Sequence, residues 1–97
     1  MLTSKQRAFL RAMANDLSPI FHVGKSGVTP ELVESIQNAL QARELIKCNV
    51  LDNCMLSAKE AAVMLSERTR SDVVQVIGSR FVLYRKKKKD PKIVLPR

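Results

Sequence analysis

The sequence predicts one small α/β domain of the α+β, two-layer kind, in which three helices pack on a four-stranded mixed sheet. Its 97 residues suit a single domain, and 45% of them are hydrophobic, as in ordinary globular proteins. Segments with helical periodicity alternate with short runs rich in β-branched residues. Two such runs near the end of the chain are separated by Gly78-Ser79 alone, which indicates a hairpin. The expected order of elements is therefore α-β-α-β-α-β-β.

The first helix is expected to begin at Thr3 or Ser4, either of which can cap it, and to end near Asp16. Apolar residues repeat along it at helical spacing, and they are Leu10, Met13, Ala14 and Leu17. Arg7 and Arg11 lie one turn apart on the opposite face of this helix.

A short strand, 20–23, follows Pro19, and a turn separates it from the second helix. Thr29 is a good N-cap and Pro30 suits the first helical position, so this helix is expected to run to about Arg43. The residues expected to face the core are Leu32, Val33, Ile36, Ala39 and Leu40.

A second strand is expected over residues 45–51, because Ile46, Cys48 and Val50 alternate with polar residues. Ser57 and Glu60 then form a capping box, which predicts a third helix that ends near residue 69.

The last two strands, 72–77 and 80–85, are expected to pair across the Gly78-Ser79 turn. In the simplest register Val74 and Val76 share a core face with Phe81 and Leu83. The other face of the hairpin would then carry Val73, Gln75, Ile77, Arg80, Val82 and Tyr84.

Residues 1–85 are expected to form the domain, and residues 86–97 a basic C-terminal tail. The four consecutive lysines at 86–89 cannot contribute to a core and are expected to be mobile or bound to a partner. Docking of Ile93-Val94-Leu95 on the domain stays open at this point.

Composition favours a cytoplasmic, monomeric protein that needs no membrane, metal or cofactor. No apolar run approaches the ~18 residues of a membrane-spanning helix, and the N-terminus has no continuous apolar stretch of the signal-peptide kind. Cys48 and Cys54 are expected to be free thiols in that compartment. A single histidine and two cysteines offer too few ligands for a zinc site.

Positive charge is concentrated at the two ends of the chain. The net charge is +8. Residues 80–97 hold eight basic residues against one acidic residue, and residues 1–25 hold four against one. The middle of the chain, residues 26–79, holds five basic and seven acidic residues. This distribution predicts binding to a polyanion, with nucleic acid as the natural partner.

The segment Gly24-Lys25-Ser26-Gly27 is the main candidate site, because it is a glycine-rich turn between a strand and a capped helix. A phosphate-binding loop of the nucleotide-hydrolase type would need a further glycine at position 19, which is Pro19. The remaining G-x-x-G pattern is used by single-strand RNA binders to hold the nucleic-acid backbone. The glycines would permit close approach, Lys25 would pair with a phosphate, and Ser26 could donate a hydrogen bond.

Further candidates for the same surface are Lys5, Arg7, Arg11, Lys47, Arg80 and Arg85. The arginines of the first helix would extend it only if that helix lies beside the loop, and they would otherwise form a solvated face. Tyr84 is a candidate for stacking on a base. His22 has no nucleophile or acid placed near it by any motif, and no pair of carboxylates is placed for acid–base chemistry, so an enzyme is not expected.

Several separated motifs resemble one protein family. They are Leu2-Thr3, Lys5-Gln6, Leu10-Arg11, Pro19, Gly24-Lys25-Ser26-Gly27, Ala42-Arg43-Glu44-Leu45-Ile46-Lys47, Gln75-Val76-Ile77-Gly78, Val82-Leu83-Tyr84 and the closing Pro91 to Arg97. In this order they resemble the CRM domain (chloroplast RNA splicing and ribosome maturation), and most of all its stand-alone bacterial YhbY-like members. The resemblance extends nearly from end to end of the chain.

The resemblance implies a fold similar to the C-terminal domain of translation initiation factor three, and RNA binding through Gly24 to Gly27 and the basic surface beside it. It also implies an association with ribosomal RNA in precursors of the large ribosomal subunit. An alternative function is a protein-interaction module that docks on a ribosomal or assembly protein. Exposure of Val73, Ile77 and Val82 on the hairpin would favour that alternative.

Overall fold

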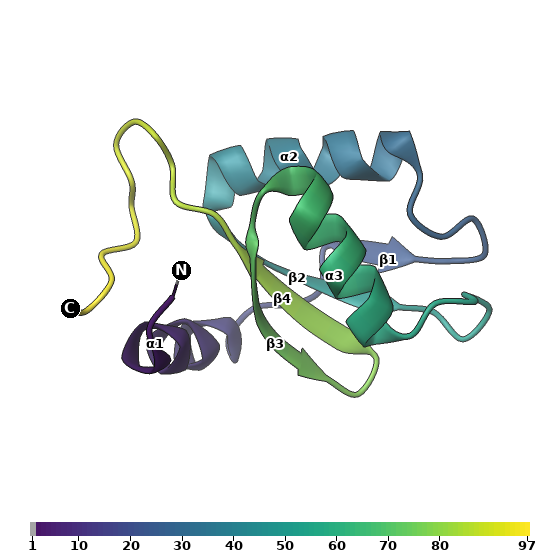
Figure 1. The fold of residues 1–97 in the computed structure, drawn as a ribbon, viewed down its shortest axis with the longest axis horizontal. Helices are drawn as coiled ribbons and strands as arrows, with labels where there is room; N and C mark the ends of the chain where they lie inside the picture. The colour runs from purple at the N-terminus through teal and green to yellow at the C-terminus, as the bar shows by residue number, and fades with distance from the viewer. Residues whose placement is uncertain (1) are drawn as a thin grey trace.

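The computed structural model describes residues 2–97 and has the predicted order of elements (Figure 1). The four strands form one mixed sheet in the order β1-β2-β4-β3, and they are β1 (Phe21–Val23), β2 (Leu45–Val50), β3 (Asp72–Ile77) and β4 (Arg80–Tyr84). The helices are α1 (Ser4–Ala14), α2 (Pro30–Arg43) and α3 (Ala58–Thr69). β1 and β2 are parallel, and β4 runs antiparallel to both of its neighbours. The predicted fold class is therefore confirmed.

Each helix begins at the predicted capping residue. The Thr3, Thr29 and Ser57 side chains each accept a hydrogen bond from a backbone N–H in the first turn of α1, α2 and α3. Ser57 and Glu60 form the expected reciprocal capping box. The first helix ends two residues earlier than predicted, at Ala14.

The sheet is covered on both faces, but unequally. One face of the sheet packs against α2 and α3, with Ile36, Leu40 and Leu65 buried against Ile46 and Phe81. The opposite face is covered only at one end, where α1 lies across the sheet (Figure 1). The buried residues there are Leu10, Ala14, Leu45, Val74, Val82 and Tyr84.

A bulge in β3 overturns the predicted face of Val74. The Gly78-Ser79 turn and the Ile77–Arg80 pair agree with the prediction, but the register shifts between Val73 and Gln75. The extra residue turns Val74 toward α1, while Val73 packs against the core on the α2 and α3 side.

The second face of the hairpin is also a core face. Val82 and Tyr84 are buried beneath α1, although the sequence predicted them on the other side from the core. Tyr84 is only 3% exposed, so it cannot stack on a base. Burial of Val82 takes one of the three residues away from the apolar surface on which the protein-interaction alternative depended, while Ile77 stays 62% exposed.

The C-terminal tail folds back onto the domain. Glu44 is fully buried, and its carboxylate accepts hydrogen bonds from the backbone N–H groups of Lys87, Lys92 and Ile93 at 2.7–3.1 Å. Ile93 and Leu95 pack beside the core cluster under α1. The expectation that the lysine run stays unpacked is therefore wrong at Lys87, whose backbone is held by Glu44.

The two cysteines are free thiols, and burial raises the pKa of the Cys48 thiol to about 12. Over residues 2–97, no helix is long and apolar enough to cross a membrane. Within the same residues, no group of three histidine, cysteine or acidic side chains is placed to hold a metal.

Candidate nucleic-acid interface

The Gly24–Gly27 loop lies at one end of the sheet, where the carboxyl ends of the parallel strands β1 and β2 meet (Figure 1). The loop closes as a tight turn, because the Gly27 N–H donates to the Gly24 carbonyl at 2.9 Å. Gly27 has a φ of +67°, a backbone conformation that glycine adopts at little cost. The first turn of α2 follows directly, so the loop presents backbone N–H groups at the positive end of a helix dipole.

The loop is supported from below by the segment between β2 and α3. Leu51 donates its N–H to the Val23 carbonyl at 2.9 Å, which joins the starts of the two loops. A Cβ added at Gly24 would lie 3.4 Å from the Leu51 side chain and 3.8 Å from the Asn53 side chain. Lys25 and Ser26 are both exposed. The turn is thus fixed on its inner side and open to a ligand on its outer side.

Polar side chains line the sheet face next to the loop, where α1 does not reach. We call the row of His22, Lys47, Asn49 and Arg80 the open face. Asn49 pairs in register with both His22 and Arg80, so these three side chains cross three adjacent strands on one face of the sheet.

Hydrogen bonds order the floor of the open face. The Asn49 side chain lies 3.5 Å from the His22 ring and accepts a 2.8 Å hydrogen bond from the Ser79 hydroxyl. Sequence reasoning did not identify His22 and Asn49 as interface residues. The sequence shows that each of them alternates with apolar residues along its strand. It does not show the strand register that places His22 beside Asn49.

The predicted site residues fall into three groups in the structure. Lys47 and Arg80 lie on the open face, near the loop. Lys5, Arg7 and Arg11 lie on α1, at the far end of the sheet from the loop (Figure 1). Arg85 lies between α2 and α3, where its side chain contacts the backbone of both helices. Only the first group joins the loop.

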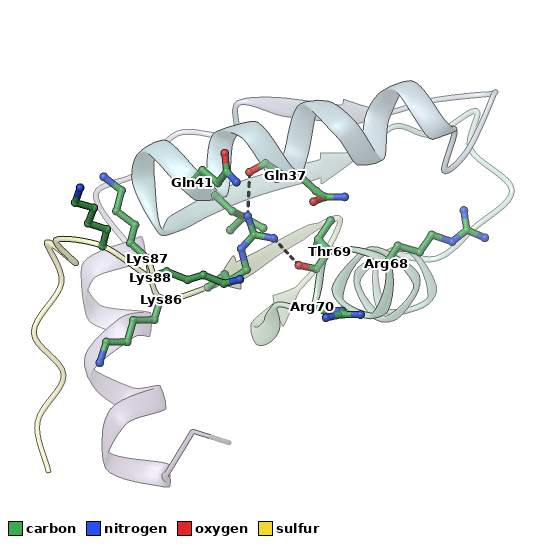
Figure 2. Close-up of a pocket in the computed structure, with 11 residues that line it drawn as sticks. Gln37, Gln41, Arg68, Thr69, Arg70, Lys86, Lys87 and Lys88 are labelled. Atoms are coloured by element: carbon green, nitrogen blue, oxygen red, sulfur yellow. Dashed lines mark hydrogen bonds between the residues drawn. The ribbon is translucent and has the colours of Figure 1, made fainter.

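Two of the predicted arginines have structural hydrogen bonds. The Arg7 guanidinium donates to the backbone carbonyls of Val73 and Val74, at the bulge of β3. The Arg85 guanidinium donates to the Thr69 carbonyl at 2.7 Å and to the Gln37 carbonyl at 3.2 Å, as the dashed lines in Figure 2 show. Arg7 thus donates to carbonyls at the bulge of β3, and Arg85 donates to the carbonyl of the last residue of α3.

Comparison with known proteins finds relatives that match nearly the whole chain. The chain is 48% identical to "Probable RNA-binding protein YqeI" of Bacillus subtilis over 96 residues, which are 99% of this chain and all of that protein. It is 35% identical to an RNA-binding protein of Haemophilus influenzae, covering 99% of this chain and 96% of that one. The solution structure of SAV1595 from Staphylococcus aureus superposes with a TM-score of 0.82, at 48% identity, over 99% of this chain and all of that one.

The family model of the CRS1 / YhbY (CRM) domain matches residues 2–85, which span all three helices and all four strands. The chain therefore belongs to the CRM domain family.

Proposed function

We propose that this protein binds RNA without catalysing a reaction on it, through the Gly24–Gly27 loop and the open face. The observation that carries the proposal is the convergence of the loop, the α2 N-terminus and the basic side chains of Lys47 and Arg80 at one end of the sheet. Relatives that match nearly the whole chain are named RNA-binding proteins, which supports the same ligand. We further propose that the RNA is ribosomal RNA in precursors of the large ribosomal subunit, bound by a cytoplasmic monomer.

The arrangement suits recognition of a nucleic-acid backbone. Lys25 supplies a flexible positive charge, and the glycines allow the RNA backbone to come close to the turn. Lys47 and Arg80 would contact neighbouring phosphates, while His22 and Asn49 offer hydrogen bonds to sugars or bases. We assign Arg7 and Arg85 to positioning because their guanidinium groups already donate to backbone carbonyls. Lys5 and Arg11 are exposed and would contact an RNA large enough to extend past α1.

The proposal is tested by measuring the affinity for a structured fragment of large-subunit ribosomal RNA at several salt concentrations. Each phosphate contact releases counterions, so the logarithm of the association constant should fall with the logarithm of salt by about 0.7–0.9 per contact. With three lysine or arginine contacts at the loop and the open face, the slope should be about −2 or steeper. A slope near zero would show that the protein does not bind RNA through its phosphates.

The two glycines of the loop are expected to respond differently to alanine. Gly27→Ala forces a side chain into a left-handed conformation and should lower the free energy of unfolding by about 1–2 kcal/mol. Gly24→Ala has room for its methyl group, so its melting temperature should change little. It should bind RNA nearly as well as the natural protein, because the added methyl group would point toward Leu51 and Asn53 on the inner side of the turn. Thermal unfolding and RNA titration of both variants check this, and a large loss of affinity in Gly24→Ala would contradict the assignment of the outer side of the turn as the RNA-facing side.

A further inference from the structure

A second basic site lies away from the loop, where α2, α3 and the tail meet. It is a pocket of about 780 Å³, and we call it the basic pocket. Seven of its eleven lining residues are cationic, and they are Arg68, Arg70, Arg85, Lys86, Lys87, Lys88 and Lys89. Within the described part of the chain, no aspartate or glutamate lines it. Figure 2 shows the tail lysines along one side of the pocket and Arg68 and Arg70 along the other.

Part of this charge has a structural explanation. The C-terminal ends of α2 and α3 carry partial negative charge, and the Arg85 guanidinium donates to the carbonyl of Thr69 at the end of α3 and to that of Gln37 in the second half of α2. The Arg85 side chain is half-buried and forms the floor of the pocket. Neutralising two helix ends requires about one unit of positive charge. The remaining six cations exceed that need, and the exposed ones among them would repel one another unless an anion lies between them.

Three residues in or next to the basic pocket have a backbone conformation that is unfavourable for a side chain. In residues 2–97 the non-glycine residues with positive φ are Glu44 at +66°, Arg70 at +55° and Asp90 at +54°. Arg70 lines the pocket, Asp90 follows the lysine run, and Glu44 anchors that run through its carboxylate. Left-handed backbone costs a non-glycine residue about 1–2 kcal/mol, and such residues concentrate at binding sites. Arg70 ends α3, a position where glycine is the usual residue.

Glu44 gives the lysine run a defined shape. Its carboxylate holds the backbone at Lys87 and again at Lys92, so the residues between them form a closed loop above the helix ends. The exposed Lys88 and Lys89 side chains are carried by this loop and not by a free chain end. A binding site formed in this way loses little conformational entropy when it takes a ligand.

A shallow groove leads from the basic pocket along α2 toward the Gly24–Gly27 loop. It shares Gln37, Gln41 and Arg68 with the pocket and extends to Pro30, at the start of α2. The groove offers amide groups and one carboxylate, Glu34, so it suits hydrogen bonds to bases or sugars more than a further row of phosphates. α2 has 14 residues and is therefore about 21 Å long, at 1.5 Å per residue. The Gly24–Gly27 loop lies before its first turn, and the basic pocket lies toward its C-terminal end.

We propose that the basic pocket is a second RNA site, which takes phosphate groups of the strand that the Gly24–Gly27 loop also holds. The strand would run along α2, with phosphates bound at both ends and bases or sugars over the groove between them. Arg68, Arg70 and the exposed tail lysines would contact phosphate, and Arg85 and Glu44 would be positioning residues. The inference rests on the proposed RNA-binding function, because it assigns the same ligand to a further site.

The test is a titration of the isotope-labelled full chain, followed by amide chemical shifts, with a short unstructured RNA in one arm and inorganic phosphate in the other. We expect the RNA to shift amides both at residues 24–27 and at residues 68–70 and 86–89. The double variant Arg70→Glu with Lys88→Glu should abolish the second set and weaken RNA affinity at least tenfold, while the first set persists. Arg97→Glu, exposed and outside the pocket lining, is the control for lost positive charge; it changes the net charge by half as much as the double variant, so its affinity loss should stay well below the square root of the double variant's factor.

The outcomes separate the two proposals. RNA-induced shifts at the loop alone would overturn the second site and leave the proposed function standing. Shifts at the pocket alone would overturn RNA binding at the loop and, with it, the proposal that one strand occupies both sites. Saturation of the pocket by inorganic phosphate that RNA cannot displace would show a site for small anions and overturn the RNA assignment.

Discussion

Glu44→Ala is expected to release the C-terminal tail and to lower the free energy of unfolding by about 3 kcal/mol. The carboxylate is buried and accepts three backbone N–H groups from the tail. A buried donor left without its acceptor costs about 1–3 kcal/mol. The expected loss is smaller than three such costs, because the released tail can form hydrogen bonds with water. Urea unfolding measures the loss of stability. Trypsin cleavage within residues 86–89 measures the undocking and should be at least tenfold faster in the variant.

Two further variants are controls for Glu44→Ala. Glu67→Ala removes an exposed carboxylate from α3, and its stability should stay within about 0.5 kcal/mol of the natural protein. Glu44→Gln keeps one acceptor oxygen and the backbone strain at φ +66°, so its stability should lie between that of Glu44→Ala and that of the natural protein. Equal trypsin cleavage in all the proteins would show that Glu44 does not hold the tail.

The stabilisation from Glu44 should depend on pH in a defined direction. Burial by itself raises the pKa of the Glu44 carboxyl, but the backbone hydrogen bonds from Lys87, Ile93 and Lys92, with the positive charge of Lys87, lower it further and leave it below its usual value. A carboxyl whose pKa is lower in the folded state stabilises the fold above its unfolded pKa, near 4.5. The stability difference between the natural protein and Glu44→Gln should therefore be constant near neutral pH and shrink below about pH 4.5.

Local signals in the sequence were sufficient for most of the fold. The caps at Thr3, Thr29 and Ser57 act within one helical turn, and α2 begins and ends at the predicted residues. The Gly78-Ser79 turn likewise set the end of the hairpin, where Ile77 pairs with Arg80. Such features depend on neighbouring residues alone, which is why periodicity and capping patterns can find them.

The errors concern contacts between distant parts of the chain. The bulge that turns Val74 toward α1 has no glycine to mark it, and it is stabilised by Arg7, 66 residues earlier than Val73. Tyr84 is buried because α1 covers its face of the sheet, which no local pattern specifies. Glu44 looked like one acidic residue in a run of charged and apolar ones, yet it fixes a tail more than 40 residues away. Tertiary packing decides such positions, so a single sequence could not supply them.

In the candidate interface, too, local features could be predicted from the sequence, and contacts between distant residues could not. The Gly24–Gly27 loop was visible because its glycines, its lysine and the helix after it are contiguous. The open face requires the register of three strands, which brings Arg80 beside Asn49 across 31 positions of sequence. The same basic residues that suggested one surface in the sequence are spread by the fold over the loop end, α1 and the basic pocket.

Lys25→Glu is expected to weaken binding to ribosomal RNA at least tenfold while leaving the melting temperature almost unchanged. Lys25 is exposed, so the substitution removes no packing from the core. It should remove one phosphate contact, lowering the salt slope by about one, and it adds repulsion at the point of closest approach. The tenfold loss corresponds to about 1.4 kcal/mol.

Arg97→Glu is the matched control for Lys25→Glu, because it makes the same change in net charge at an exposed position of the tail. If binding depends on overall charge alone, the two variants should lose affinity equally, and the loop would have no special role. If the loop holds the RNA backbone, Lys25→Glu should lose far more. Combining Lys25→Glu with Arg80→Glu should then weaken binding beyond either single change, because the two side chains reach different phosphates from the same end of the sheet.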